Sequence, residues 1–212
     1  KTGPFPPGTW ENGMDAKSVI VDGSPLFWSV EVSVNRATSH IIVAGFRDDG
    51  LPHVEVVATR AGVEWLPGWF ADRVEDYGGM TVVVQKNGAP ASGLIPDLQT
   101  VEGVTVHEWA GGELGAWTGK FFDLVAKSKK PVDGGVRTGI AHLPQPVLDL
   151  AAVNAVIVYL AGGAPMVDRK KGSGDVTPLV GAVAAVGKLL EREDRQQKSV
   201  YEQDDVTAVV LA

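Results

Sequence analysis

Three strand-like runs follow one another near the start of this chain, and their spacing limits the folds open to it. The runs LFWSVEVSV, HIIVAGFR and HVEVVATR are rich in Val, Ile and aromatic residues, and only short polar turns separate them. Strands with such short connections pair antiparallel, so residues 26–60 predict a three-stranded meander. A fully apolar run at 80–84 predicts a central strand buried on both faces, and 101–107 predicts another strand.

Helical segments alternate with the later strands. Residues 65–77, 113–130 and 146–160 carry apolar side chains at helical spacing, and 88–99 predicts a further helix. A meander followed by strand–helix alternation predicts a mixed sheet, antiparallel and then parallel, with helices on both faces. This is the order of the ribonuclease H-like three-layer α/β fold, which we predict here, although other three-layer α/β folds compete.

Length and composition fit one such domain. The chain has 212 residues, of which 44% are hydrophobic and 21% charged, as in ordinary globular proteins. The Pro- and Gly-rich residues 1–23 predict an extended linker from a segment upstream, 24–192 the domain, and 193–212 a charged tail with a possible last strand. No apolar window approaches the length of a membrane span, and the start lacks the layout of a signal peptide.

Charge and cysteine content narrow the possible partners. The net charge is −7, whereas proteins that coat DNA are usually basic, so any contact with nucleic acid must use a local basic face. Cysteine is absent, which excludes disulfides and thiolate metal sites and fits a reducing compartment. The four histidines lack the spacing of a helical metal site, and His142 is expected to be structural and hydrogen-bonded.

The stretch from Met166 to Leu190 combines a short strand, a basic glycine-containing loop, one aspartate and an apolar helix. Asp175 stands where the loop ends, and the helix after it has almost no polar face, which predicts burial. A carboxylate at this position is either a plain N-cap or a ligand for a metal next to a phosphate. The basic residues beside it are Arg169, Lys170 and Lys171.

Two further positions matter if the fold is ribonuclease H-like. In that fold, two divalent ions hydrolyse a phosphodiester and need hard oxygen ligands from the first strand, the fourth strand and a late helix. The first strand offers Glu31, which alternatively faces solvent on a half-exposed strand. The fourth strand ends in Gln85, an amide that binds metal weakly and adds no charge.

Four segments, in order along the chain, carry a resemblance to a known family. They are FWSVEVSVNRATSHIIVAG, MTVVVQKNGAPASGLIPDL, GIAHLPQPVLDLAAVNAV and VDRKKGSGDVTPLVGAVAAV. Over residues 10–205 the chain resembles the C-terminal nuclease domain of large terminase subunits from tailed phages and prophages. An Asp usually stands at the position of Glu31 in that family, and a carboxylate at the position of Gln85, while Asp175 matches the family's last acidic position.

The resemblance implies a Mg²⁺- or Mn²⁺-dependent endonuclease that cuts concatemeric double-stranded viral DNA during packaging, in the cytoplasm of the host. It implies Glu31, Gln85 and Asp175 as catalytic positions, with Glu31 and Asp175 holding metal. Two ions are expected, one more securely than the other. The implied partners are an upstream ATPase domain, the small terminase subunit and the portal. No GxxxxGK[ST] loop is present in this chain.

The basic residues implied to contact DNA are Lys86, Arg169, Lys170 and Lys171, each of which could equally be a solvated surface side chain. Because Gln85 replaces a carboxylate, we expect weak or strongly Mn²⁺-dependent cleavage, unless another carboxylate such as Asp168 serves instead. A docking module that has lost catalysis is one alternative. Another ribonuclease H-like enzyme, such as a transposase or junction resolvase, is a second.

Overall fold

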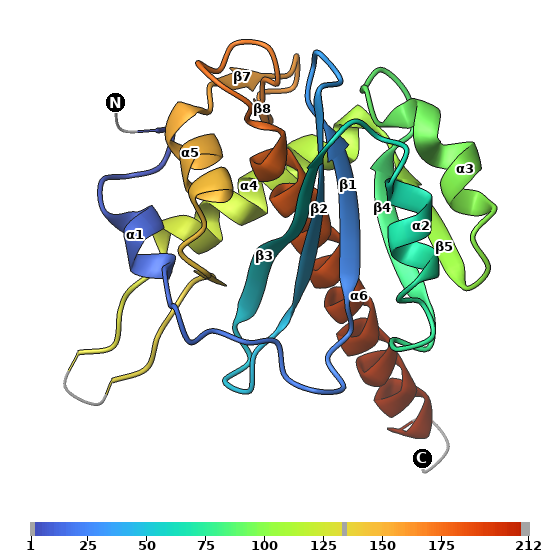
Figure 1. The fold of residues 1–212 in the computed structure, drawn as a ribbon. Coiled ribbons are helices and arrows are strands. Elements are labelled where there is room, and N and C mark those ends of the chain that lie inside the picture. Colours follow the sequence, from blue (N-terminus) through green and yellow to red (C-terminus); the bar gives the residue numbers. More distant parts are fainter. Residues whose placement is uncertain (1–2, 133–134, 209–212) are drawn as a thin grey trace.

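The computed structural model describes residues 3–132 and 135–208, with the backbone alone described from 197 onward. A six-stranded sheet in the order β5-β4-β1-β2-β3-β6 forms its centre (Figure 1). The first three strands make the predicted antiparallel meander, and β4 and β5 add to β1 in parallel. Their bounds are β1 (Phe27–Val32), β2 (Thr38–Phe46), β3 (Pro52–Ala61), β4 (Met80–Gln85), β5 (Val104–Trp109) and β6 (Ala141–His142).

Helices cover both faces of this sheet. One face packs against α4 (Gly111–Ala126), α5 (Pro146–Asn154) and the long α6 (Thr177–Ala208). The opposite face packs against α2 (Leu66–Ala71), the 3-10 turn η1 (Ser92–Leu94) and α3 (Ile95–Gln99). The predicted ribonuclease H-like three-layer fold is therefore confirmed. None of the helices in the described part of the chain is long and apolar enough to cross a membrane.

Strand β1 is buried along its whole length because both of its faces are covered. Trp28, Val30 and Val32 join the core under α2 and α3, and Phe27 joins the core under α6. Since side chains alternate between faces, Glu31 lies on the α6 face. Only 2% of Glu31 is exposed, so the alternative of a solvent-facing glutamate on this strand is wrong.

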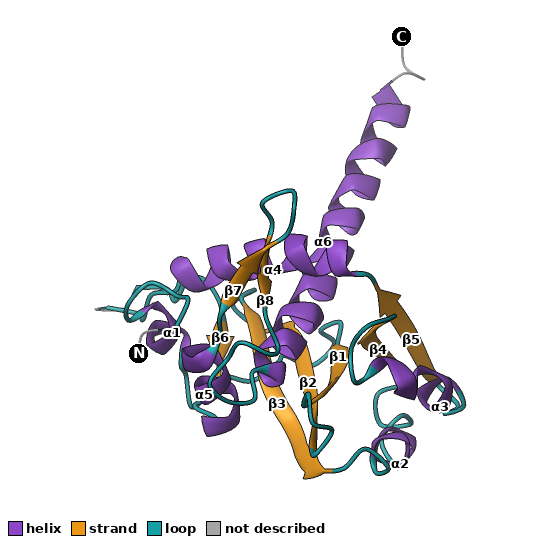
Figure 2. Cartoon of the chain, turned by 90° about the horizontal axis from the view of Figure 1, so that it is seen from above, coloured by secondary structure: helices purple, strands orange, loops and turns teal. Residues whose placement is uncertain are grey.

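Helix α6 packs closely on the sheet and on α4 because two of its glycines allow close approach. A Cβ at Gly181 would overlap Ile42 on β2. The carbonyl of Gly181 accepts a 2.7 Å hydrogen bond from the Ser29 hydroxyl on β1. A Cβ at Gly187 would overlap the ring of Trp117 on α4. The helix therefore lies against β1, β2 and α4, and its far end extends beyond the sheet (Figure 2).

We expect Gly187→Ala to destabilise the chain although alanine is the better helix former. Overlap with Trp117 should cost about 1–3 kcal/mol net of the propensity gain. Gly119→Ala on α4 is the matched control, because a Cβ there meets nothing within 4 Å. The control should gain about 0.5–1 kcal/mol. Chemical denaturation measures both changes, and a stabilised Gly187→Ala would contradict the close packing described above.

Three segments differ from the sequence-based expectation. The helix predicted over 146–160 ends at Asn154, because the β-branched and aromatic residues after it form β7 (Ile157–Tyr159), which pairs with β8 (Pro165–Val167). The helix predicted over 65–77 is shortened to α2. At 88–99 one predicted helix is replaced by η1 and α3.

The two ends of the chain also differ. Helix α6 continues to Ala208 where a last strand was considered, since residues 191–198 are good helix formers without Gly or Pro. Residues 209–212 lie outside the described residues. Near the start, Trp10 on α1 (Thr9–Gly13) is buried, so part of 1–23 belongs to the packed core. The domain boundaries proposed at 23 and 192 stay a prediction.

His142 has the structural role that the sequence suggested. Its ring is fully buried and stacks on Trp10 with centroids 4.1 Å apart. Both ring nitrogens lie 3.0 Å from backbone carbonyl oxygens, those of Leu143 and Trp10. Burial lowers the pKa of His142, although both carbonyl oxygens favour the protonated ring. A neutral ring donates to only one of the two oxygens, and it packs between α1 and β6.

Candidate active site

A row of four polar and aromatic residues crosses the sheet at the ends of β1 and β4. Glu31 on β1 stands opposite His40 on β2. On the other side of β1, Ser29 pairs with Val83 of the parallel strand β4. Two residues further along both strands, this register brings Gln85 beside Glu31. Gln85 in turn pairs with Trp109 on β5. The carboxyl ends of parallel strands meet at one edge, which is why residues distant in sequence gather here.

Glu31 is paired with an arginine from the loop after β8. The Arg169 guanidinium donates two hydrogen bonds, of 2.8 Å from Nη2 to Oε1 and 3.1 Å from Nε to Oε2. Burial raises the pKa of Glu31, and the charge and hydrogen bonds of Arg169 oppose that rise. This bidentate pair compensates a carboxylate that is withdrawn from solvent.

Asp175 both caps α6 and contacts the sheet. Its Oδ1 accepts hydrogen bonds from the Thr177 backbone N–H at 3.0 Å and the Thr177 hydroxyl at 2.6 Å. Its Oδ2 lies 2.9 Å from Nε2 of His40. Partial burial works to raise the pKa of Asp175, but the hydrogen bonds from His40 and Thr177 outweigh it and hold the pKa below its ordinary value. Asp175 thus satisfies the first N–H of α6 from one position before the N-cap residue, Val176, and the metal role stays a prediction.

His40 is the functional candidate that the sequence reasoning missed. The ring is 2% exposed, its Nε2 faces Asp175, and its Nδ1 lies 3.0 Å from Oγ1 of Thr59. Since Asp175 is ionised, Nε2 carries the proton and Nδ1 accepts from the threonine. The signal was present in the sequence as a histidine at the start of an otherwise apolar strand, HIIVAG. Through His40, the carboxylates of Glu31 and Asp175 belong to one cluster.

Gln85 contributes an amide that is only half satisfied. Its Nε2 donates a 2.7 Å hydrogen bond to the Asn87 carbonyl. Its Oε1 is buried and has no hydrogen-bond partner among the described residues. A buried carbonyl oxygen without a donor is costly and fits a site that a cation or a donor from a ligand would complete.

Arg169 spans the row of residues above the sheet. Its guanidinium binds Glu31 on β1, and its Cζ lies 6.0 Å from the ring centroid of Trp109 on β5. Gln85 stands between those two residues in the strand order. Arg169 is 13% exposed, so it is not the solvated surface side chain that was the alternative for it, and its contact with DNA stays a prediction.

The remaining basic residues lie on the rim. Lys171 is well exposed, with Nζ 3.8 Å from Asp168, and Lys86 is well exposed, with Nζ 3.5 Å from Glu108. Lys170 is also exposed, and its backbone N–H donates to Asp168. Asp168 accepts from the backbone N–H groups of both lysines, at 2.8 and 3.2 Å, so its carboxylate organises its own loop. Nothing in these contacts directs Asp168 toward the position of a second metal ligand.

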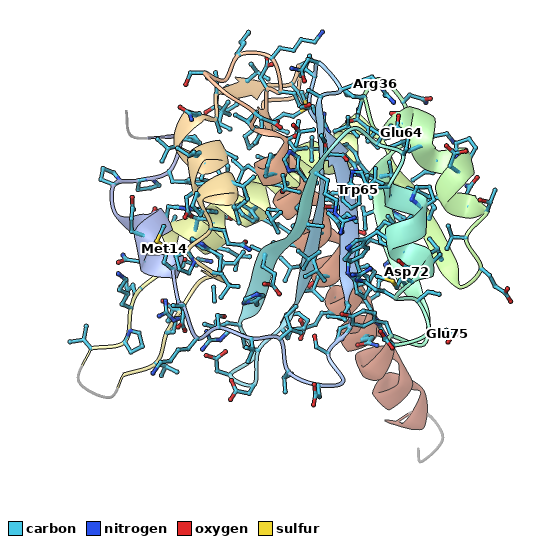
Figure 3. The ribbon with its side chains drawn as sticks, viewed as in Figure 1. Met14, Arg36, Glu64, Trp65, Asp72 and Glu75 are labelled. Atoms are coloured by element: carbon cyan, nitrogen blue, oxygen red, sulfur yellow. The ribbon has the colours of Figure 1, made fainter. Side chains whose placement is uncertain are left out.

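A second arginine ties together the two turns that border the site. Arg36, labelled in Figure 3, lies in the turn between β1 and β2. It donates a 2.6 Å hydrogen bond to the Pro90 carbonyl in the loop after β4. Arg36 has a φ of 58°, a left-handed conformation that costs a non-glycine residue energy. This hydrogen bond joins the segments that follow Glu31 and Gln85.

The donor set fits one divalent cation better than two. Glu31 and Asp175 supply two negative charges, and Gln85 supplies a neutral oxygen. No three Asp, Glu or His side chains of the described residues converge into a ready-made metal site. Burial raises the pKa of Glu31, and the negative charge of Asp175 adds to that rise.

Comparison with known proteins identifies the architecture. No protein-family model and no curated protein matches the chain. Among solved structures, the large terminase of bacteriophage HK97 superposes with a TM-score of 0.62 and 17% identity, over 87% of this chain and 43% of that one. The large terminase nuclease from thermophilic phage G20c with bound magnesium superposes with a TM-score of 0.53 and 14% identity, over 84% and 96%.

The chain has the fold of a large terminase nuclease. A mutant nuclease domain of the large terminase subunit of bacterial virus Sf6 with manganese shares this terminase nuclease fold, with a TM-score of 0.53 and 10% identity over 86% of this chain and 97% of that one. The family resemblance found in the sequence is therefore confirmed at the level of the fold. The chain spans less than half of the HK97 terminase.

Proposed function

We propose that this chain is a metal-dependent endonuclease domain that cleaves concatemeric double-stranded DNA during genome packaging. The observation that carries the proposal is the cluster of Glu31, His40 and Asp175, which joins the first strand to the start of the late helix. Two of the matched solved structures are terminase nuclease domains, one with bound magnesium and the other with manganese. Carboxylates from these two elements are the hard oxygen ligands that such ions require.

In the proposed hydrolysis of the phosphodiester, a metal ion and the side chains around it would have separate roles. Glu31 and Asp175 would hold Mg²⁺ or Mn²⁺, with Oε1 of Gln85 as a weaker neutral ligand. When bound, the ion supplies an activated water and stabilises charge that develops on the phosphate. His40 keeps Asp175 oriented through a 2.9 Å contact, as partners behind metal ligands commonly do. A second ion would be bound more weakly because Gln85 brings no charge.

The rim of the site would hold the DNA backbone. Lys86 directly follows Gln85, Lys171 lies two residues after Arg169, and both side chains are exposed; Lys170 adjoins Lys171. Contacts from lysine to phosphate position a duplex without reading its sequence. With a net charge of −7, the isolated chain should bind DNA weakly, and strongly salt-dependently.

A second candidate function is a nuclease-fold module with weak or no catalysis that serves DNA or portal docking. Two observations favour it: the neutral Gln85 at the end of β4, and the pairing of Glu31 with Arg169. The further partners proposed on the likeness to large terminases are an ATPase domain, a small terminase subunit and the portal. The proposed place of action is the host cytoplasm.

Plasmid nicking tests the proposed function. We expect nicking with Mn²⁺, slower nicking with Mg²⁺, and none with EDTA, because a neutral ligand at position 85 weakens the binding of both ions and Mg²⁺ demands the more regular ligand set. Restoring Mn²⁺ after EDTA should restore cleavage, which controls for damage by the chelator. Absence of nicking with either metal at low salt would favour the docking module.

A further inference from the structure

Arg169 already supplies a cation to the buried carboxylate of Glu31. Both oxygens of Glu31 accept a hydrogen bond from the guanidinium. The side chain of Arg169 is 13% exposed and that of Glu31 is 2% exposed. A carboxylate buried to this degree needs a counter-charge, and a planar guanidinium matches it in bidentate geometry. Glu31 is therefore neutralised within the protein itself.

A divalent ion and Arg169 compete for the same ligand. A metal bound by Glu31 would approach the oxygens that now face Nη2 and Nε, and the guanidinium would repel it. The ring centroid of Trp109 lies 6.0 Å from Cζ of Arg169 in the same conformation that pairs the arginine with Glu31. This aromatic contact would support the guanidinium if it left Glu31.

The loop that carries Arg169 is also a loop suited to meet DNA. Lys170 and Lys171 follow Arg169 directly, and Asp168 holds their backbone N–H groups at 2.8 and 3.2 Å. A phosphodiester offers two oxygens at the spacing that a guanidinium pairs with, as a carboxylate does. A DNA backbone bound by this loop is therefore the natural competitor for Arg169.

We propose that Arg169 is a resident counter-cation that closes Glu31 to divalent ions until a DNA phosphate draws it away. Binding of DNA then frees Glu31 and raises the affinity of the site for metal. This coupling rests on the proposed nuclease function. It would keep metal, and hence cleavage, dependent on an engaged duplex.

Calorimetric titration of Mn²⁺ into the DNA-free chain tests the first half of the proposal. Arg169→Met should bind Mn²⁺ on the order of 10- to 100-fold more tightly than the wild type. Arg73→Met is the matched control, because Arg73 also stacks on a tryptophan, Trp69, at 4.4 Å, but on the other face of the sheet. The control should bind Mn²⁺ as the wild type does.

Removal of Arg169 leaves Glu31 buried without its partner, so folding must be followed separately. Arg169→Met should have a melting temperature that rises with Mn²⁺, whereas that of the wild type should change little. Arg169→Lys keeps the charge without the bidentate geometry, and should lie between the two in Mn²⁺ affinity. If Arg169→Met is unfolded at every Mn²⁺ concentration and Arg169→Lys binds no more tightly than the wild type, the proposal is wrong.

An unmodified duplex, with nicking checked on a gel after the titration, tests the second half. Added to the wild type, it should tighten Mn²⁺ binding, and in Arg169→Met it should have no such effect. Equal Mn²⁺ affinity of wild type and Arg169→Met without DNA would overturn the proposal. Nicking by the wild type keeps the two ideas separable: if plasmid is cleaved while Arg169 has no effect on metal affinity, the nuclease function stands and only the coupling fails.

Discussion

Asp175→Asn is expected to abolish DNA nicking while leaving the fold nearly as stable as before. Asparagine caps helices as well as aspartate does, so the hydrogen bonds to Thr177 are retained. His40 can exchange tautomers with Thr59 as its partner and accept from the new amide. The negative charge that would hold a metal is lost, and nicking should fall on the order of 100-fold or more.

Asp175→Ala separates the cap from the charge. This variant loses both, so it should nick as poorly as Asp175→Asn and in addition lose about 1 kcal/mol of stability with the cap. Denaturation curves and nicking rates for the two variants give the comparison. If Asp175→Asn cleaves DNA like the wild type, Asp175 is a helix cap and nothing more.

The dependence of folding stability on pH in the acid range gives a further test of Asp175. The pKa of Asp175 is lower in the folded chain than its ordinary value of 3.8. Its ionised form therefore stabilises the fold at pH values above 3.8, and this contribution is lost as the pH falls toward the lower folded pKa. Asp175→Asn should lack that part of the pH dependence.

The second large expected effect is an increase in Mg²⁺-dependent nicking when Gln85 is replaced by a carboxylate. Gln85→Glu keeps the length of the side chain and adds the negative charge that the site lacks, and Gln85→Asp adds it on a shorter arm. Either change should tighten Mg²⁺ binding on the order of tenfold and raise the Mg²⁺-dependent nicking rate toward the Mn²⁺ rate. Oε1 of Gln85 is buried and has no hydrogen-bond donor from any residue that the structure describes, so we expect a charged metal ligand to act at this position.

Asn87→Asp controls for net charge in that experiment. Asn87 is exposed in the loop directly after β4, and its carbonyl accepts the hydrogen bond from Gln85. The same charge placed there should leave metal affinity unchanged. Should Gln85→Asp and Gln85→Glu both cleave at the wild-type rate with Mg²⁺, the second ligand does not lie at the end of β4.

Much of the architecture follows from the sequence alone. Alternating apolar residues and short polar turns are local signals, so the meander of β1, β2 and β3 and the buried strand β4 were correctly predicted. The aspartate before an apolar run likewise marked the start of α6, where Asp175 accepts a hydrogen bond from the Thr177 N–H. Boundaries failed where two local preferences competed, as at 155–160, where pairing with β8 overrode a helical pattern.

The tertiary structure decided what surrounds each candidate residue. Because side chains alternate along a strand, Glu31 lies on the other face of the sheet from Val30 and Val32. The alternation does not say whether that face is covered, and only the packing of α6 buries Glu31. Its partner Arg169 lies 138 residues away, and Asp175 meets His40 across 135 residues. Such contacts depend on how helices dock on the sheet, which no local pattern encodes. The sequence therefore determined which residues carry the charge, and the fold decided which charges neutralise one another.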